Sequence, residues 1–285
     1  MTLGSDPRAL LRKHGLSPKK SFGQNFLLNQ GVLARIAEAC VPDDERGRTS
    51  VVEIGAGTGA LTTALLERAR TVVAIERDRD LVPLLTEALA PAIASGNLRL
   101  LETSATAPHH LEEVLGGLDA PRALCGNLPY QITGQLIELA VGLASSFSRA
   151  VFMVQEEVAD RLIAAPSTKE YGALSVFTQA RFDVKRVVRV SPGSFHPPPK
   201  VTSAVVSFTP TETPRAVEDD TFRRVVKLAF AMRRKTLRNA WASLGEETVR
   251  AASVATDIDL GRRGETLTVE DFARFTAVIR ERKTP

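Results

Sequence analysis

Cysteine is nearly absent from this sequence: only Cys40 and Cys125 occur among 285 residues. Two cysteines cannot form a disulfide framework or a cysteine-based zinc site, so we expect reduced thiols, with Cys125 a small buried residue, and no bound metal. Long uncharged apolar runs are also lacking, and none reaches the ~18 residues that a membrane helix needs. The first residues contain no apolar core followed by a cleavage site, so we expect a cytoplasmic protein.

The whole sequence is 44% hydrophobic and 25% charged, with 19 Gly and 16 Pro, and this composition excludes a disordered chain and a coiled coil. Positive charge is unevenly placed. The net charge is +4 overall, but residues 1–25 alone carry +4 and residues 180–241 carry +8. Positive charge clustered in an otherwise acidic protein is typical of proteins that bind a polyanion, although a solvated surface explains it equally well.

Apolar runs typical of strands alternate with helical patterns over most of the chain. Strands are expected at residues 50–54, 71–76, 98–102, 122–126, 150–155, 186–190 and 203–208. Helices are expected at residues 30–40, 60–68, 80–94, 132–144, 156–164 and 172–182. This order predicts an α/β fold with a doubly wound, mainly parallel seven-stranded sheet.

The composition changes at the polar segment PTETPRAVEDD, residues 210–220, which is typical of a hinge. Beyond it only helical patterns occur, at residues 221–244, 246–255 and 269–282. We therefore expect two domains, a sheet domain at 1–209 with a basic N-terminal arm and a small all-helical domain at 210–285.

A glycine-rich loop follows the first strand of the sheet and contains Gly55, Gly57 and Gly59. Glycine lets the backbone turn sharply and lets a ligand approach closely. The next strand ends in Glu76, where a carboxylate can accept hydrogen bonds from both hydroxyls of a ribose. The two features predict a nucleoside-containing cofactor. The loop also fits a nicotinamide dinucleotide site, but three glycines within five residues favour S-adenosylmethionine.

The fourth strand runs into Asn127-Leu128-Pro129-Tyr130. Ligands of open α/β sheets bind beyond the carboxyl ends of the strands, so this segment is expected beside the cofactor. The side-chain oxygen of Asn127 and the backbone carbonyl near Pro129 can accept the two hydrogens of a planar amine and aim its lone pair at a methyl donor. Proline makes that turn rigid, and Tyr130 can stack on a base. The segment predicts methyl transfer to an exocyclic amine without a metal or a general base.

With these motifs the chain resembles the KsgA-type small-subunit (16S) rRNA adenine N6-dimethyltransferase family, nearly from end to end. The resemblance is carried by residues 22–27 (FGQNFL), 52–59, 127–130, 195–203 and 229–239. It implies a Rossmann-like class I methyltransferase domain and S-adenosylmethionine as the donor. It also implies dimethylation of two adjacent adenines near the 3′ end of small-subunit rRNA, during ribosome biogenesis.

The resemblance assigns roles to single residues. It places Asn25, Leu27, Gly55, Gly57, Gly59, Glu76, Ser104 and Asn127 around the cofactor, and Asn127, Leu128, Pro129, Tyr130 and Phe195 around the acceptor adenine. Phe195 would cover the second face of an extruded base. The family usually has an aspartate where Ser104 stands. A neutral hydroxyl is a weaker acceptor, so we expect cofactor affinity to be lower by roughly tenfold, about 1.4 kcal/mol.

The expected helix at 221–244 has one basic and one apolar face. Its basic residues are Arg223, Lys227, Arg233, Arg234, Lys235 and Arg238. Such residues suit contacts to RNA phosphates, which position RNA without reading its sequence. The expected partner is the small ribosomal subunit with its 16S rRNA, and we expect a monomer.

Three other functions stay open at this point. One is a large-subunit (23S) rRNA adenine methyltransferase that confers macrolide resistance, and another is an assembly checkpoint factor with secondary catalysis. The third, a nicotinamide-dependent oxidoreductase, leaves residues 127–130 and the basic helix unexplained.

Overall fold

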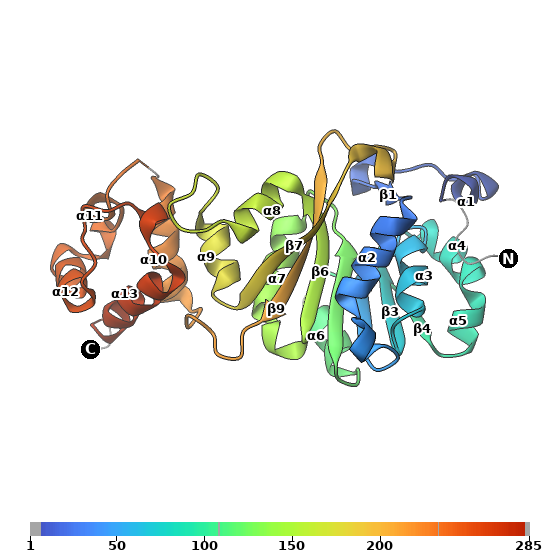
Figure 1. The fold of residues 1–285 in the computed structure, drawn as a ribbon, viewed down its shortest axis with the longest axis horizontal. Helices are drawn as coiled ribbons and strands as arrows, with labels where there is room; N and C mark the ends of the chain where they lie inside the picture. The colour runs from blue at the N-terminus through green and yellow to red at the C-terminus, as the bar shows by residue number, and fades with distance from the viewer. Residues whose placement is uncertain (1–6, 108, 233, 283–285) are drawn as a thin grey trace. The chain divides into compact units, whose positions relative to one another are not determined.

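The computed structural model describes residues 7–107, 109–232 and 234–282, which form two compact units (Figure 1). The first unit runs to Ala159 and resumes at Lys185–Pro210, and the second comprises Asp160–Val184 and the chain from Thr211 onward. The units therefore differ from the domains expected at 1–209 and 210–285, because residues 160–184 group with the second unit. The helix α9 (Ala173–Gln179) explains this, since its Phe177 packs edge-on against Phe222 at 6.2 Å.

The first unit is built on a seven-stranded sheet with the strand order β4-β3-β2-β5-β6-β9-β7. The strands are β2 (Ser50–Ile54), β3 (Thr71–Glu76), β4 (Leu98–Glu102), β5 (Arg122–Asn127), β6 (Arg149–Gln155), β7 (Phe182–Val190) and β9 (Ser203–Pro210). Strands β2 to β6 pair in parallel and β9 pairs antiparallel with β6. This confirms the mainly parallel α/β fold. The strand order reverses beside β2, so the loops after β2 and β5 flank the crevice where such sheets bind ligands.

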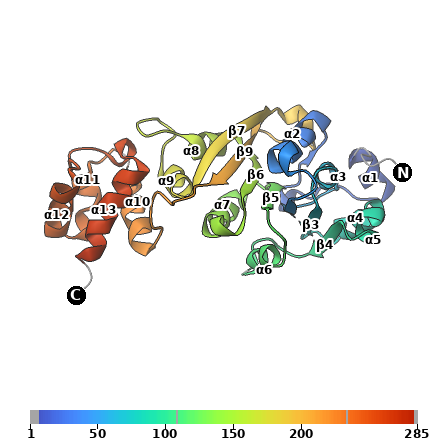
Figure 2. The same cartoon turned by 60° about the horizontal axis from the view of Figure 1, so that its bottom comes forward.

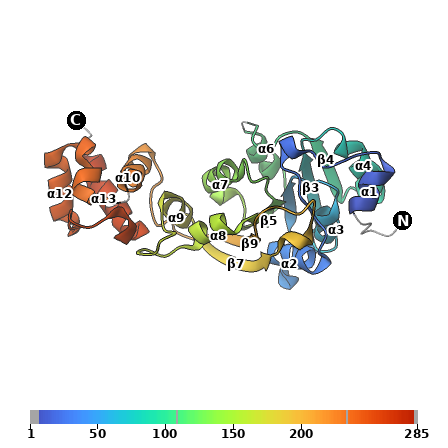
Figure 3. The same cartoon turned by 90° about the horizontal axis from the view of Figure 1, so that it is seen from above.

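Helices cover both faces of this sheet (Figures 2 and 3). On one face α2 (Gln30–Cys40) packs against α3 (Ala60–Leu66), and α6 (His110–Gly116) and α7 (Thr133–Gly142) lie on the other. The single helix expected at 80–94 is instead two, α4 (Leu81–Ala88) and α5 (Ala90–Ala94). Pro91 at the start of α5 explains the break, because proline has no backbone N–H to continue a helix.

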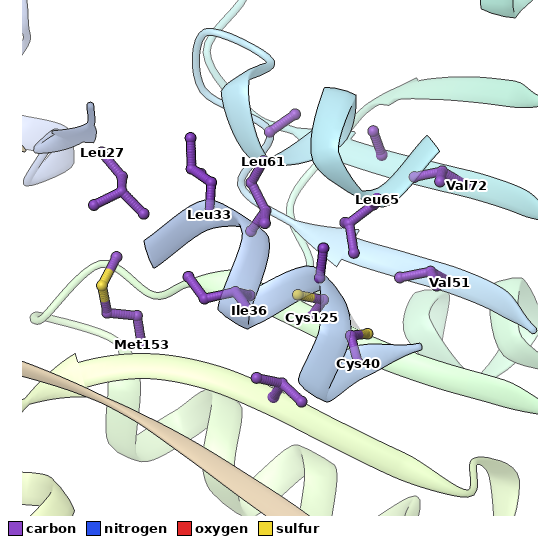
Figure 4. Packing of buried hydrophobic residues seen from close by; sticks show 14 of the residues in the cluster. Leu27, Leu33, Ile36, Cys40, Val51, Leu61, Leu65, Val72, Cys125 and Met153 are labelled. Atoms are coloured by element: carbon purple, nitrogen blue, oxygen red, sulfur yellow. The ribbon is translucent and has the colours of Figure 1, made fainter. Parts of the chain in front are cut away.

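The core of the first unit forms between α2, α3 and the sheet (Figure 4). Asn29 caps the start of α2, and its side chain accepts a hydrogen bond from the Val32 N–H at 3.1 Å. Its buried face repeats every three or four positions and consists of Val32, Leu33, Ile36, Ala37 and Cys40. Cys125 is also fully buried, and burial raises the pKa of its thiol well above the usual value. Its thiol therefore stays protonated and is not a nucleophile.

A second, two-stranded sheet ties the N-terminal segment to the far end of the first unit. Strand β1 (Phe26–Leu27) pairs antiparallel with β8 (Phe195–His196), and Leu27 lies opposite Phe195. The sequence did not predict this pair, because strands of two residues are too short to show alternation.

The second unit contains α9, α10 (Asp220–Ala231), α11 (Leu237–Ala240), α12 (Glu246–Thr256) and α13 (Val269–Glu281). Its core is centred on Trp241, whose ring stacks on Phe275 at 3.9 Å and whose indole N–H donates to the Val225 carbonyl at 2.9 Å. The helical character expected for this part of the chain is therefore present.

The continuous helix expected at 221–244 is wrong: α10 ends at Ala231 and α11 begins at Leu237. The N–H groups of Leu237 and Arg238 donate to the carbonyls of Arg262 and Leu260, at 2.8 and 3.0 Å. In a continuous helix they would donate to carbonyls four residues earlier. Tertiary hydrogen bonds have replaced helical ones at this break.

Candidate functional site

A pocket opens where β2, β3, β4 and β5 end, and we call it the strand-end pocket. Its empty volume is about 790 Å³, counting the open solvent at its mouth. Its lining includes Asn25, Gly55, Glu76, Ser104, Asn127 and Tyr130. The structure therefore gathers most of the expected cofactor and acceptor residues into one place.

The glycine loop forms the floor of this pocket. Gly55, Gly57 and Gly59 all have positive φ, at 77°, 60° and 82°, a conformation that glycine adopts without strain. Gly55 and Gly57 line the strand-end pocket. Gly59 lies outside that lining, and a Cβ there would come within 3.0 Å of Leu85. Glycine at position 59 therefore allows the turn and the packing of α3 against α4.

Glu76 ends β3 and is buried at 5% exposure. One carboxylate oxygen accepts from the Gly57 N–H and the other from the Asp78 N–H, both at 2.8 Å. Burial raises the pKa of this carboxyl, while these backbone hydrogen bonds lower it. A carboxylate has about four acceptor sites, so Glu76 can still accept from hydroxyl donors.

Asn127 is the last residue of β5, and its side-chain orientation is set by one contact. The amide nitrogen Nδ2 donates to the backbone carbonyl of Asn25 at 2.9 Å. A carbonyl can only accept, so this hydrogen bond requires Nδ2 on that side and leaves Oδ1 as an acceptor. The N-terminal segment thus fixes the orientation of the Asn127 amide.

The hydrogen bonds after Asn127 distinguish between the carbonyls near Pro129. The Pro129 carbonyl already accepts from the Ile132 N–H and the Thr133 hydroxyl, both at 3.1 Å. Its two lone pairs are therefore engaged. The preceding carbonyl, that of Leu128, accepts no hydrogen bond within the described ranges, so it is the main-chain acceptor available beside Asn127.

Tyr130 lines the strand-end pocket with a half-buried ring. Its phenolic oxygen lies 2.7 Å from the hydroxyl of Ser203, the first residue of β9. Burial raises the pKa of this phenol, and the Ser203 hydrogen bond lowers it in part. Tyr130 therefore stays neutral at ordinary pH.

Leu27 and Phe195 do not line the strand-end pocket in this structure. Both are buried, at 5% and 4% exposure, and they lie opposite each other in the β1–β8 pair. Leu27 lines a smaller neighbouring cavity together with Glu53 and Asn127. The expected contact of Phe195 with an adenine stays a prediction.

Ser104 does line the strand-end pocket, just beyond the end of β4. Its hydroxyl lies 2.9 Å from the Thr106 hydroxyl and accepts from the Thr106 N–H at 3.3 Å. These contacts hold the serine oxygen in the wall of the pocket.

Glu53 lines the smaller neighbouring cavity and was missed by sequence reasoning. It is fully buried in β2, and its Oε2 accepts from the Thr62 hydroxyl at 2.6 Å, while Oε1 has no hydrogen-bond partner among the described residues. Burial raises the pKa of this carboxyl to about 7, against the Thr62 hydrogen bond, and the nearby Glu76 raises it further. The sequence feature that could have revealed Glu53 is an acidic residue within the apolar run VVEI.

A second missed group fastens the N-terminal segment over the pocket. Asp78 is 3% exposed and accepts from Lys19 Nζ at 2.5 Å and from Gln24 Nε2 at 2.7 Å. Burial acts to raise the pKa of Asp78, but these hydrogen bonds outweigh it and lower the pKa. Phe22, which lines the pocket from this segment, has the Arg77 guanidinium 4.5 Å from its ring centre. We call residues 19–25 the strap.

The expected RNA-contacting residues lie on three segments of the second unit. Arg223 and Lys227 are on α10, where with Arg224 they line a shallow groove. Arg223 is also paired with Glu218 at 3.3 Å. Arg234 and Lys235 are exposed between α10 and α11, Arg238 is exposed on α11, and Arg233 lies outside the described residues. One continuous basic helix face is therefore not present.

Within the described ranges, no group of three histidine, cysteine or acidic side chains is arranged to hold a metal ion. No helix in that part of the chain is long and apolar enough to span a bilayer.

Comparisons with known proteins agree with this geometry. A family model described as "Ribosomal RNA adenine dimethylase" matches residues 15–281. The "Ribosomal RNA small subunit methyltransferase A" of Geobacter metallireducens is 44% identical over 278 residues, which cover 94% of this chain and 98% of the relative. The protein of the same name from Anaeromyxobacter dehalogenans is 43% identical over 279 residues, covering 96% and 97%.

Solved structures show the same architecture. A dimethyladenosine transferase from Plasmodium falciparum matches with a TM-score of 0.70 and 26% identity, covering 88% of this chain and 95% of that one. The 23S rRNA methyltransferase ErmE matches with a TM-score of 0.64 and 26% identity, covering 90% and 100%.

Proposed function

The chain belongs to the ribosomal RNA adenine dimethylase family, and we propose that its strand-end pocket holds S-adenosylmethionine beside an extruded adenine of small-subunit rRNA. The enzyme dimethylates adenines of 16S rRNA, and the sites we assign are two adjacent adenines near its 3′ end. The relatives that share 43–44% identity carry the small-subunit name, whereas the large-subunit enzyme ErmE shares 26%.

The residues present fit an adenosine-based methyl donor. Glu76 offers its remaining acceptor sites to the ribose hydroxyls, and Ser104 in the pocket wall offers a hydroxyl to the adenine amine. Gly55 and Gly57 leave the floor without side chains, so a ligand can lie directly on the backbone. When bound, S-adenosylmethionine supplies an electrophilic methyl group.

The observation that carries the proposal is the fixed amide of Asn127. An adenine amine is a poor nucleophile because its lone pair is delocalised into the ring. Oδ1 of Asn127 and the Leu128 carbonyl can accept its two hydrogens, which favours a tetrahedral nitrogen with a localised lone pair. Tyr130 offers a stacking surface to the extruded base, worth ~1–3 kcal/mol. Positioning and hydrogen bonding supply the catalysis.

Incubation of the protein with labelled S-adenosylmethionine and unmethylated small subunits tests this function. We expect label in dimethyladenosine of 16S rRNA, and its loss in Asn127→Ala at unchanged stability. Asn97→Ala, which removes an exposed amide at the other end of the sheet, should keep wild-type activity. Label confined to large-subunit RNA would support the resistance enzyme. Subunit binding without label would support an assembly factor instead.

We further propose that Lys227, Arg234, Lys235 and Arg238 contact rRNA phosphates, with Arg223 and its neighbour Arg224 beside them. Each phosphate contact releases bound counterions, so affinity for the subunit should fall steeply with added salt. The double variant Lys227→Ala/Arg238→Ala should reduce the slope of log affinity against log salt by about 2. An unchanged slope would mean that RNA does not contact this surface.

A further inference from the structure

We infer that Ser203 is a positioning residue for methyl transfer, because its hydroxyl holds the ring of Tyr130 in the acceptor site. The inference rests on the proposed function, since it assigns Tyr130 to the acceptor base. Ser203 itself is not among the residues that line the strand-end pocket. It acts through one hydrogen bond to Tyr130, a residue of the same unit that is distant in the sequence.

The geometry of that bond is well defined. The two hydroxyl oxygens lie 2.7 Å apart, although the residues are separated by 73 positions in the sequence. Within the described ranges, neither hydroxyl makes another hydrogen bond. A bond between two buried or half-buried hydroxyls is worth more than an exposed one, because water does not replace it.

Ser203 provides a rigid anchor for a less regular segment. It is fully buried and lies opposite Gln155 in the antiparallel β6–β9 ladder, so its hydroxyl cannot move far. Tyr130 lies in the turn between β5 and α7, outside regular structure. The anchored phenol restricts rotation of the ring about its side-chain torsions. An aromatic ring held at one angle is a better stacking surface than a mobile one, because less rotational freedom is lost when the base arrives.

The same bond links the acceptor turn to the segment that follows Phe195. That segment, residues 197–202, leads from β8 directly into β9 at Ser203. Residues 127–130 and 195–203, two segments that carry the family resemblance, are therefore joined by a side-chain contact as well as by the sheet. The contact gives the buried serine a role that core packing alone does not explain, since an alanine of similar volume would pack equally well.

The test is a double-mutant cycle on dimethylation of small subunits. Ser203→Ala and Tyr130→Phe each remove one partner with almost no change in volume. Each should lower kcat by about fivefold, the effect of one hydrogen bond, and the double variant should fall no further. The KM for subunits and the cofactor Kd should stay within about twofold of wild type. Ser207→Ala is the matched control, since its hydroxyl reaches only the Lys185 carbonyl at 3.4 Å.

Wild-type kcat in Ser203→Ala would overturn the inference, as would effects of the two single variants that multiply in the double variant. A rise in the KM for subunits with unchanged kcat would also overturn it. That result would mean that the hydrogen bond contributes to binding of the subunit and not to methyl transfer. If Ser203→Ala does not fold, Tyr130→Phe still removes the same bond from the pocket side. Failure of the wild-type enzyme to label 16S rRNA would refute the proposed function separately.

Discussion

The buried carboxyl of Glu53 makes a measurable prediction about stability. Its Oε1 has no partner among the described residues, and its only hydrogen bond runs from Thr62 to Oε2. Burial raises its pKa from 4.5 to about 7. The native protein therefore holds this proton at pH values where the unfolded chain has already released it.

The sign and size of the effect follow from that difference. Because the native pKa is the higher one, protonation stabilises the native state fully below pH 4.5, and this stabilisation is lost as the pH rises to about 7. The shift from 4.5 to about 7 corresponds to about 3 kcal/mol, of which about 2 kcal/mol is lost between pH 5.5 and pH 8. The variant Glu53→Gln cannot ionise and should not show this loss.

Urea unfolding at pH 5.5 and pH 8, followed by circular dichroism, measures the effect. Relative to wild type, Glu53→Gln should gain about 2 kcal/mol in unfolding free energy between pH 5.5 and pH 8. Fluorescence of Trp241 reports the second unit separately, since it is the single tryptophan. Glu102→Gln, at an exposed carboxylate, is the control. Parallel pH dependence in wild type and Glu53→Gln would show that Glu53 ionises as if it were in water.

Three further outcomes are expected. Gly126→Ala places a Cβ 2.6 Å from the Ile54 carbonyl oxygen and should destabilise the protein by about 2 kcal/mol in urea unfolding, whereas Gly134→Ala, with nothing within 4 Å, should not. Ser104→Asp should tighten S-adenosylmethionine binding about tenfold by calorimetry, and no gain would mean that this side chain does not face the adenine. Asp78→Asn weakens the attachment of the strap and should lower the affinity for S-adenosylmethionine about fivefold by calorimetry. Unchanged affinity would mean that the strap does not contribute to cofactor binding.

The parts of the fold set by local patterns could be predicted from the sequence. The helix at 30–40 has its expected bounds because its apolar residues share one face and Asn29 caps its start. The break between α10 and α11 could not be predicted, because it depends on carbonyls of Leu260 and Arg262 that fold back from later in the chain. No proline or glycine marks it.

The candidate site divides in the same way. The glycine loop follows β2 directly, and Glu76 and Asn127 are the last residues of β3 and β5, so their neighbourhood was predictable from strand order. The long-range contacts of the site were not, since Asn25 orients Asn127 across 102 positions and Lys19 of the strap reaches Asp78 across 59. Local sequence specifies which groups can react, and tertiary contacts specify how they point.

The pairing of β1 with β8 has a consequence for how the enzyme is made. While the chain emerges during translation, Phe26 and Leu27 have no strand to pair with until Phe195 and His196 have been synthesised. The carbonyl of Asn25, which orients the side-chain amide of Asn127, adjoins that pairing. A nascent or prematurely terminated polypeptide would carry the glycine loop but lack its completed wall. Competence to modify a ribosome is therefore acquired late, when the first unit is nearly finished.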